Sequence, residues 1–170
     1  MDIRAYGRIM LMFVIVVLLQ VMIVNNINIG VWGITPMLYT LFILALPFET
    51  PKWVLLVLGF FVGFVVDIFC DTPGLNAGAS TVMAFARPWV LGLLAPRDGY
   101  ENGTRPYLMQ MGFLWYIYYS GLLVLIHHAA YFMLDAFGFD HFFKTLSQIV
   151  LTALFTEVLL VFSQYIAFRK

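Results

Sequence analysis

Residues 53–80 read WVLLVLGFFVGFVVDIFCDTPGLNAGAS, an apolar run followed by a Pro-Gly turn. Gly59, Gly63 and Asp67 are spaced by four, so a helix places them on one face. Two glycines allow another backbone to approach closely, and the carboxylate follows one turn later. An ionised aspartate in mid-membrane costs roughly 2.5 to 3.5 kcal/mol on insertion scales. This face is therefore expected to pack on protein and not on lipid.

The composition around this run is typical of a membrane protein. Of the 170 residues, 63% are apolar and 11% are charged, and the mean hydropathy is +0.95, whereas soluble domains are about 25% charged. We expect an all-α membrane protein, one integral membrane domain over residues 1–170, with about six transmembrane helices. These cover residues 9–24, 35–48, 53–70, 77–94, 107–134 and 146–168. The second is the weakest, because so short an apolar run also fits a re-entrant or tilted piece.

Lys and Arg resist translocation, so their distribution predicts the orientation of the helices. Six spans leave Lys144 alone on one side and Arg87 inside a span, and all other positive residues fall on the side of the two termini. We therefore expect both termini to be cytoplasmic. The residues on that side are Arg4, Arg8, Lys52, Arg97, Arg105, Arg169 and Lys170.

Two opposite charges lie inside neighbouring expected spans. Asp67 is near the end of the third, and Arg87 is near the middle of the fourth. One interpretation is that they neutralise each other or share a polar pocket between these helices, because the arginine side chain is long enough to close part of the gap. The other is that Asp67 only caps a helix end at the outer surface.

The last two expected helices carry further polar groups. Glu157 has three open interpretations: a hydrogen-bonding contact between helices, a contact to a partner, or a step in ion or proton passage. His127 and His128 close the fifth segment, and adjacent residues face about 100° apart on a helix. We therefore expect a polar cap at the outer surface and not a metal site.

Other functional classes have little support in the sequence. Nine Lys or Arg offset nine Asp or Glu, and no basic stripe follows a phosphate backbone, so we exclude nucleic acid as a main partner. Cys70 is the single cysteine, which excludes an internal disulfide. Asp67 and Asp71 are four apart, a weak signal for a metal-dependent lipid-modifying enzyme, and the common catalytic motifs are missing. We expect no catalysis, cofactor or metal.

The order of these elements resembles the rod shape-determining protein family MreD, in the form found in Bacteroidetes-like bacteria. The resemblance covers about residues 15–100, whereas the last 70 residues agree only in hydropathy and length. It rests on a basic start and on the segments Leu18-Leu19-Gln20, Thr35-Pro36, Leu46-Pro47-Phe48-Glu49, Gly59-x3-Gly63-x3-Asp67 and Gly74-Leu75-Asn76-Ala77. The positions that match the family pattern are Pro36, Gly59, Gly63, Asp67, Gly74 and Asn76.

The resemblance implies a noncatalytic, multi-pass scaffold in the bacterial cytoplasmic (inner) membrane that is needed for rod shape. Members of the family associate with MreC, a single-span membrane protein. They act with the glycosyltransferase RodA, a penicillin-binding transpeptidase and, indirectly, MreB filaments in peptidoglycan synthesis. The family is also thought to be similar in fold to the substrate-binding components of energy-coupling vitamin transporters.

That similarity gives the rival interpretation, a small-molecule substrate-binding subunit of a transporter. Its site would be a pocket at Asp67 and Arg87 together with the aromatic residues of the fifth helix. The short outer loops that we expect are unlike the lids of such subunits. We therefore prefer the scaffold, whose helix-packing or partner contacts would include Gly59, Gly63, Asp67, Arg87 and Glu157.

Overall fold

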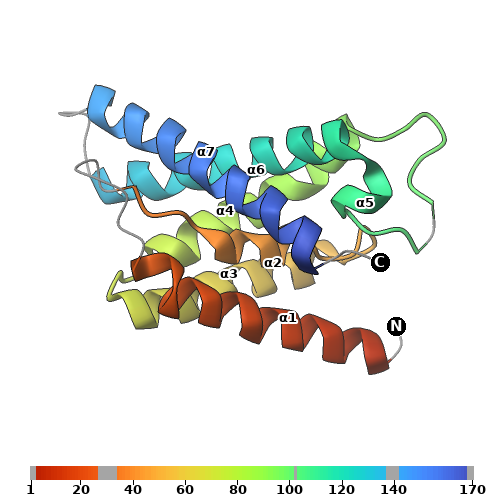
Figure 1. The fold of residues 1–170 in the computed structure, drawn as a ribbon, viewed down its shortest axis with the longest axis horizontal. Coiled ribbons are helices and arrows are strands. Elements are labelled where there is room, and N and C mark those ends of the chain that lie inside the picture. Colours follow the sequence, from red (N-terminus) through yellow and green to blue (C-terminus); the bar gives the residue numbers. More distant parts are fainter. Residues whose placement is uncertain (1–2, 27–33, 102, 137–141, 168–170) are drawn as a thin grey trace.

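The computed structural model describes residues 3–26, 34–101, 103–136 and 142–167, and its regular elements are helices. Five long helices run along the long axis of the molecule (Figure 1). In packing order, α4 lies between α3 and α6, α6 also packs on α7, and α1 packs on α3. The long helices are α1 (Ile3–Met22), α3 (Lys52–Cys70), α4 (Leu75–Leu93), α6 (Phe113–Ala136) and α7 (Phe142–Ala167); the short ones are η1 (Val24–Asn26), η2 (Leu38–Thr40), α2 (Leu41–Leu44) and α5 (Leu108–Met111).

Four of the described helices are long and apolar enough to cross a membrane. These segments are Gly7–Asn26, Lys52–Cys70, Phe113–Ala136 and Phe142–Ala167. The helix α4 is as long as α3, at 19 residues, but less apolar. Its position between α3 and α6 explains the difference, because a central helix contacts protein on most sides and can carry polar residues.

The distribution of side chains is that of a protein surrounded by hydrocarbon. On α4, the large apolar residues Val82, Phe85, Trp89 and Leu93 form one exposed stripe, and Trp89 is 73% exposed. The interior contains polar side chains, which lipid would leave without hydrogen bonds. The buried polar residues are Gln20, Thr40, Asp67, Asn76, Ser80, Arg87, Ser120, His127, His128, Thr152, Thr156 and Gln164.

The glycine face of α3 packs closely on α4, which confirms the predicted helix contact at both glycines. A Cβ atom added to Gly63 would lie 2.3 Å from the carbonyl oxygen of Asn76. One added to Gly59 would lie 2.7 Å from the Cβ of Ala84. Only glycine fits at these two positions without moving one helix away from the other.

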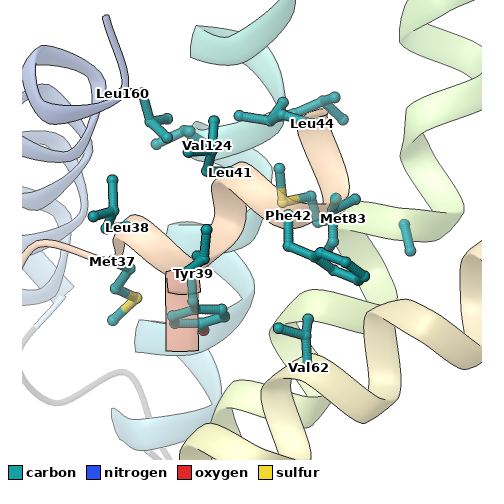
Figure 2. Close-up of a cluster of buried hydrophobic side chains, with 14 of the residues drawn as sticks. Met37, Leu38, Tyr39, Leu41, Phe42, Leu44, Val62, Met83, Val124 and Leu160 are labelled. Atoms are coloured by element: carbon teal, nitrogen blue, oxygen red, sulfur yellow. The ribbon is translucent and has the colours of Figure 1, made fainter. Parts of the chain in front are cut away.

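The predicted second helix over residues 35–48 is wrong in form. Residues 36–46, which we call the buried segment, are buried, but only η2 and α2 within them are helical. These seven helical residues rise about 10 Å, so no helix of bilayer length forms here. The segment runs from one end of the molecule to the other among the long helices (Figure 1). Figure 2 shows its side chains between those of Val62, Met83, Val124 and Leu160, which belong to α3, α4, α6 and α7.

The predicted fifth helix over residues 107–134 is two helices. Gly112 ends α5 with φ 87° and ψ 158°, and α6 begins at the next residue. A positive φ with extended ψ is open to glycine and strained for other residues. The third and fourth predicted helices, 53–70 and 77–94, are confirmed within two residues at each end by α3 and α4.

The beginning of α1 and the end of α7 lie at the same end of the bundle (Figure 1). The connection between α4 and α5 lies at that end too, and the turn between α3 and α4 lies at the opposite end. We call the first end the terminal end and the second the turn end.

Candidate functional site

Asp67 at the turn end binds the first residues of α4. Its Oδ1 accepts a hydrogen bond from the backbone N–H of Asn76 at 3.0 Å, and its Oδ2 accepts one from that of Ala77 at 2.9 Å. The hydroxyl of Thr72 donates to Oδ1 at 2.8 Å. A carboxylate at a helix N-terminus satisfies free N–H groups and interacts favourably with the helix dipole. Asp67 is thus the cap of α4, supplied by the helix that precedes it.

The predicted pairing of Asp67 with Arg87 is wrong. The carboxylate binds residues 76 and 77, whereas Arg87 lies ten residues further along the same helix, about 15 Å away at 1.5 Å per residue. The alternative interpretation, a helix cap, agrees better with the structure, because Asp67 does cap a helix. However, the helix is α4, the one that follows, and the Asp67 side chain is buried at 5% exposure.

Arg87 instead binds the carbonyl groups that follow α2. Its Nη atoms donate to the carbonyl oxygens of Leu46 and Pro47, and its Nε donates to the Tyr119 hydroxyl at 2.7 Å. That hydroxyl donates to the carbonyl oxygen of Leu44 at 3.0 Å. A cation interacts favourably with the negative end of a helix dipole. The carbonyl groups at the end of this short helix also lack N–H donors, because no further helical turn follows. Arg87 and Tyr119 therefore hold the end of the buried segment.

A chain of hydrogen bonds connects Asp67 with α6. The side-chain amide of Asn76 donates to Asp67 Oδ1 at 3.0 Å, and the Tyr39 hydroxyl donates to Asn76 Oδ1 at 2.7 Å. The Nε2 of His127 lies 2.8 Å from the Tyr39 oxygen. Because Tyr39 gives its only proton to Asn76, His127 must carry its proton on Nε2 and donate it. Four elements, α3, α4, η2 and α6, thus share one network.

The beginning of the buried segment is held by side chains from α1 and α7. Gln20 donates to the carbonyl of Pro36 at 3.0 Å and accepts from the N–H of Tyr39 at 3.2 Å. The N–H of Met37 donates to the Thr156 hydroxyl at 3.0 Å. Non-helical backbone inside a membrane needs such partners, because hydrocarbon offers none.

The predicted polar cap of His127 and His128 at the outer surface is also wrong. Both side chains are 0% exposed. His128 donates from Nδ1 to the carbonyl of Val124 at 2.8 Å, and its Nε2 lies 3.1 Å from the Thr156 hydroxyl. The two histidines therefore serve two different hydrogen-bond networks in the interior. Within the described ranges, no three His, Cys, Asp or Glu residues lie close enough to hold a metal ion.

Glu157 links α7 to α6. Its Oε1 lies 2.5 Å from the Ser120 hydroxyl, which also lies 2.6 Å from the carbonyl of Tyr116. The other carboxyl oxygen is buried and has no partner within the described part of the chain. This geometry supports the interpretation of Glu157 as a contact between helices.

A cavity of about 370 Å³ lies at the turn end, beside the network of Asp67. Tyr39 and Asn76 line it, so the network forms part of its wall. Sequence reasoning did not identify this cavity, because its walls come from α1, the buried segment, α3, α4 and α6. The signal that the sequence did contain was the polar residue Gln20 late in an apolar helix. The lining residues are Gln20, Val21, Asn25, Asn26, Thr35, Met37, Tyr39, Val66, Phe69, Cys70, Thr72, Asn76 and Tyr131.

No family model, curated protein or solved structure matches the chain.

Proposed function

We propose that the chain is a noncatalytic membrane scaffold of the MreD type, which holds a single-span protein such as MreC within the machinery of bacterial wall elongation. One observation carries the proposal. Gly59, Gly63, Asp67, Gly74 and Asn76, on which the resemblance rests, lie together in the α3–α4 hairpin. A family pattern that encodes a helix hairpin and no reactive centre is what a scaffold requires.

The proposed topology has six crossings with both termini in the cytoplasm. The five long helices and the buried segment supply the crossings. Among the described positive side chains, Arg8, Lys52, Arg97 and Arg105 belong to the terminal end, and Lys144 belongs to the start of α7 at the turn end. The positive-inside rule then assigns the terminal end to the cytoplasm of a bacterial inner membrane.

The proposed mechanism is association through helix faces. The outer faces of the helices are apolar, and the buried charges Asp67 and Arg87 are engaged in holding α4 and α2. Between helices already in lipid, association depends on close packing and a few polar contacts, worth roughly 0.6 to 2 kcal/mol each. A rigid bundle with little mass outside the membrane is suited to receive the helix of another protein. RodA, the transpeptidase and MreB would join through that partner.

Co-purification from mild detergent tests the proposal. A tagged chain should recover a single-span protein with a large extracytoplasmic domain from a rod-shaped host. Depletion of the chain itself should make the cells round. Depletion of an unrelated six-span protein is the control for general membrane stress. Normal rods after verified depletion would contradict the proposal.

The second candidate is a small-molecule-binding subunit of a transporter, and the cavity at the turn end favours it. Ligand pockets range from about 300 to 1,000 Å³, and this one has about 370 Å³. The same purification separates the candidates. A stoichiometric small molecule together with an ATPase module would support the transporter subunit and contradict the scaffold.

A further inference from the structure

The cavity at the turn end has a polar lining that is free of formal charge. Its described walls contain amide groups, hydroxyl groups and a thiol, together with apolar and aromatic side chains, and no Lys, Arg, His, Asp or Glu. The nearest carboxylate, Asp67, binds two N–H groups of α4 and the amide of Asn76. A charged ligand would lose water here and gain no opposite charge, which is costly.

Several polar groups of the lining have hydrogen-bonding capacity left for a ligand. Gln20 and Asn76 are engaged in the networks described above. Asn25 donates one N–H to the Cys70 sulfur at 3.0 Å and has a second N–H. Within the described residues, the hydroxyls of Thr35 and Tyr131 lie in the lining without a hydrogen bond to the protein. Amides and hydroxyls both donate and accept, so they match hydroxyl or amide groups of a ligand.

Apolar surface lies beside these polar groups. Phe69, Val66 and Met37 contribute to the same walls, as does the ring of Tyr131. A ligand that fills the cavity must therefore present carbon–hydrogen surface on one side and neutral polar groups on another. Uncharged sugars and related ring polyols have this combination.

We propose that this cavity binds a small, uncharged, sugar-like molecule through its hydroxyl or amide groups. The inference goes beyond the proposed scaffold function and depends only on the cavity. The cavity overlaps the site expected for a transporter subunit at Tyr131 of the fifth predicted helix, but Arg87 does not line it.

Cys70 provides a direct assay, because it is the only cysteine of the chain and lies in the cavity wall. The full-length protein in lipid nanodiscs would be treated with N-ethylmaleimide, and the rate of Cys70 alkylation would be followed by intact mass. Glucose, N-acetylglucosamine and myo-inositol are the neutral probes. Glucosamine and glucuronic acid are their charged counterparts of similar size.

We expect at least one neutral probe to slow alkylation in a saturable way, and the charged counterparts to have no effect at the same concentration. In the variant Thr35→Val, the probe concentration that gives half-maximal protection should rise about two- to tenfold, as expected for the loss of one hydrogen bond to the ligand. The matched control is Thr81→Val, because the Thr81 hydroxyl donates to the Ala77 carbonyl at 2.7 Å and is not part of the lining.

Two results would overturn the inference: no protection by any neutral probe, or equal protection by the charged sugars. Neither result bears on whether the chain recovers a single-span partner, so this inference and the scaffold proposal can fail separately.

Discussion

Asp67 shows how one carboxylate can determine the geometry of a helix hairpin. It closes α3, caps α4 and anchors the network that reaches His127. The chain reverses between the two helices through Asp71 and Gly74, both in the left-handed region with φ 55° and 84°. The cap therefore fixes where α4 begins and how deep its first turn lies in the bundle.

We expect Asp67→Asn to destabilise the fold by about 1–2 kcal/mol, because the amide keeps one acceptor and turns an N–H2 group toward backbone donors. The matched control is Asp71→Asn, four residues later, since Asp71 is exposed and Asn tolerates its positive φ. Thermal unfolding in detergent, followed by tryptophan fluorescence, measures both. Equal midpoints for the two variants would show that the cap contributes no stability.

The two glycines of α3 should tolerate a methyl group to different degrees. Gly63→Ala places a Cβ against the backbone of α4, and Gly59→Ala places one against the Ala84 side chain and the Ser80 carbonyl. Overpacking typically costs about 1–3 kcal/mol of stability. We expect Gly63→Ala to lose at least the upper value of this range and Gly59→Ala to lose less.

Gly121→Ala on α6 is the control for these glycines, because nothing lies within 4 Å of its added Cβ. It should be neutral or stabilising by up to about 1 kcal/mol, the difference in helix propensity. The yield of monodisperse protein after heating measures all three variants. A Gly63→Ala variant as stable as Gly121→Ala would contradict the close α3–α4 contact.

The position of the buried segment depends on contacts with its neighbours more than on its own tendency to form a helix. The helix α2 has four residues, Leu41–Leu44, and all four are buried. Isolated helices of this length do not form in water. The contacts of Arg87 and Tyr119 with its last carbonyls, and of Gln20 with its beginning, therefore determine its position.

Arg87→Met should destabilise the protein by about 3–5 kcal/mol. The apolar side chain fills similar space but leaves the carbonyls of Leu46 and Pro47 without donors in the interior. Arg97→Met is the control, since Arg97 is exposed in the loop after α4. Unfolding in detergent should separate the two, and similar midpoints would contradict the role assigned to Arg87.

Hydropathy predicted α3 and α4 well because Pro and Gly clusters bound their apolar runs. It failed for residues 35–48, since burial among helices and burial in lipid select the same side chains. It also failed at Gly112, where one backbone conformation divides a continuous apolar run.

The charged members of the site were found in the sequence, and their partners were not. Asp67, Arg87 and Glu157 stand out because charges are rare in apolar runs. The bond between Tyr39 and His127 joins residues 88 positions apart, and that between Met37 and Thr156 joins residues 119 positions apart. Such pairs come from packing between helices, which hydrophobic periodicity does not specify.

The proposed orientation places Cys70 and the loop after α4 on opposite sides of the membrane. In intact cells, a membrane-impermeant maleimide should label Cys70 and should not label Asp98→Cys on a Cys70→Ser background. Permeabilised cells are the control and should allow both to react. Labelling of Asp98→Cys alone in intact cells would reverse the orientation.

The bond between Met37 and Thr156 also has a consequence for biogenesis. Thr156 is translated 119 residues after Met37. During synthesis the backbone N–H of Met37 therefore lacks this hydrogen-bond acceptor until α7 has been made. The protein therefore cannot complete its interior in the order of synthesis. Chains released early, before residue 142, should be recognised as unfinished and degraded by membrane quality-control proteases.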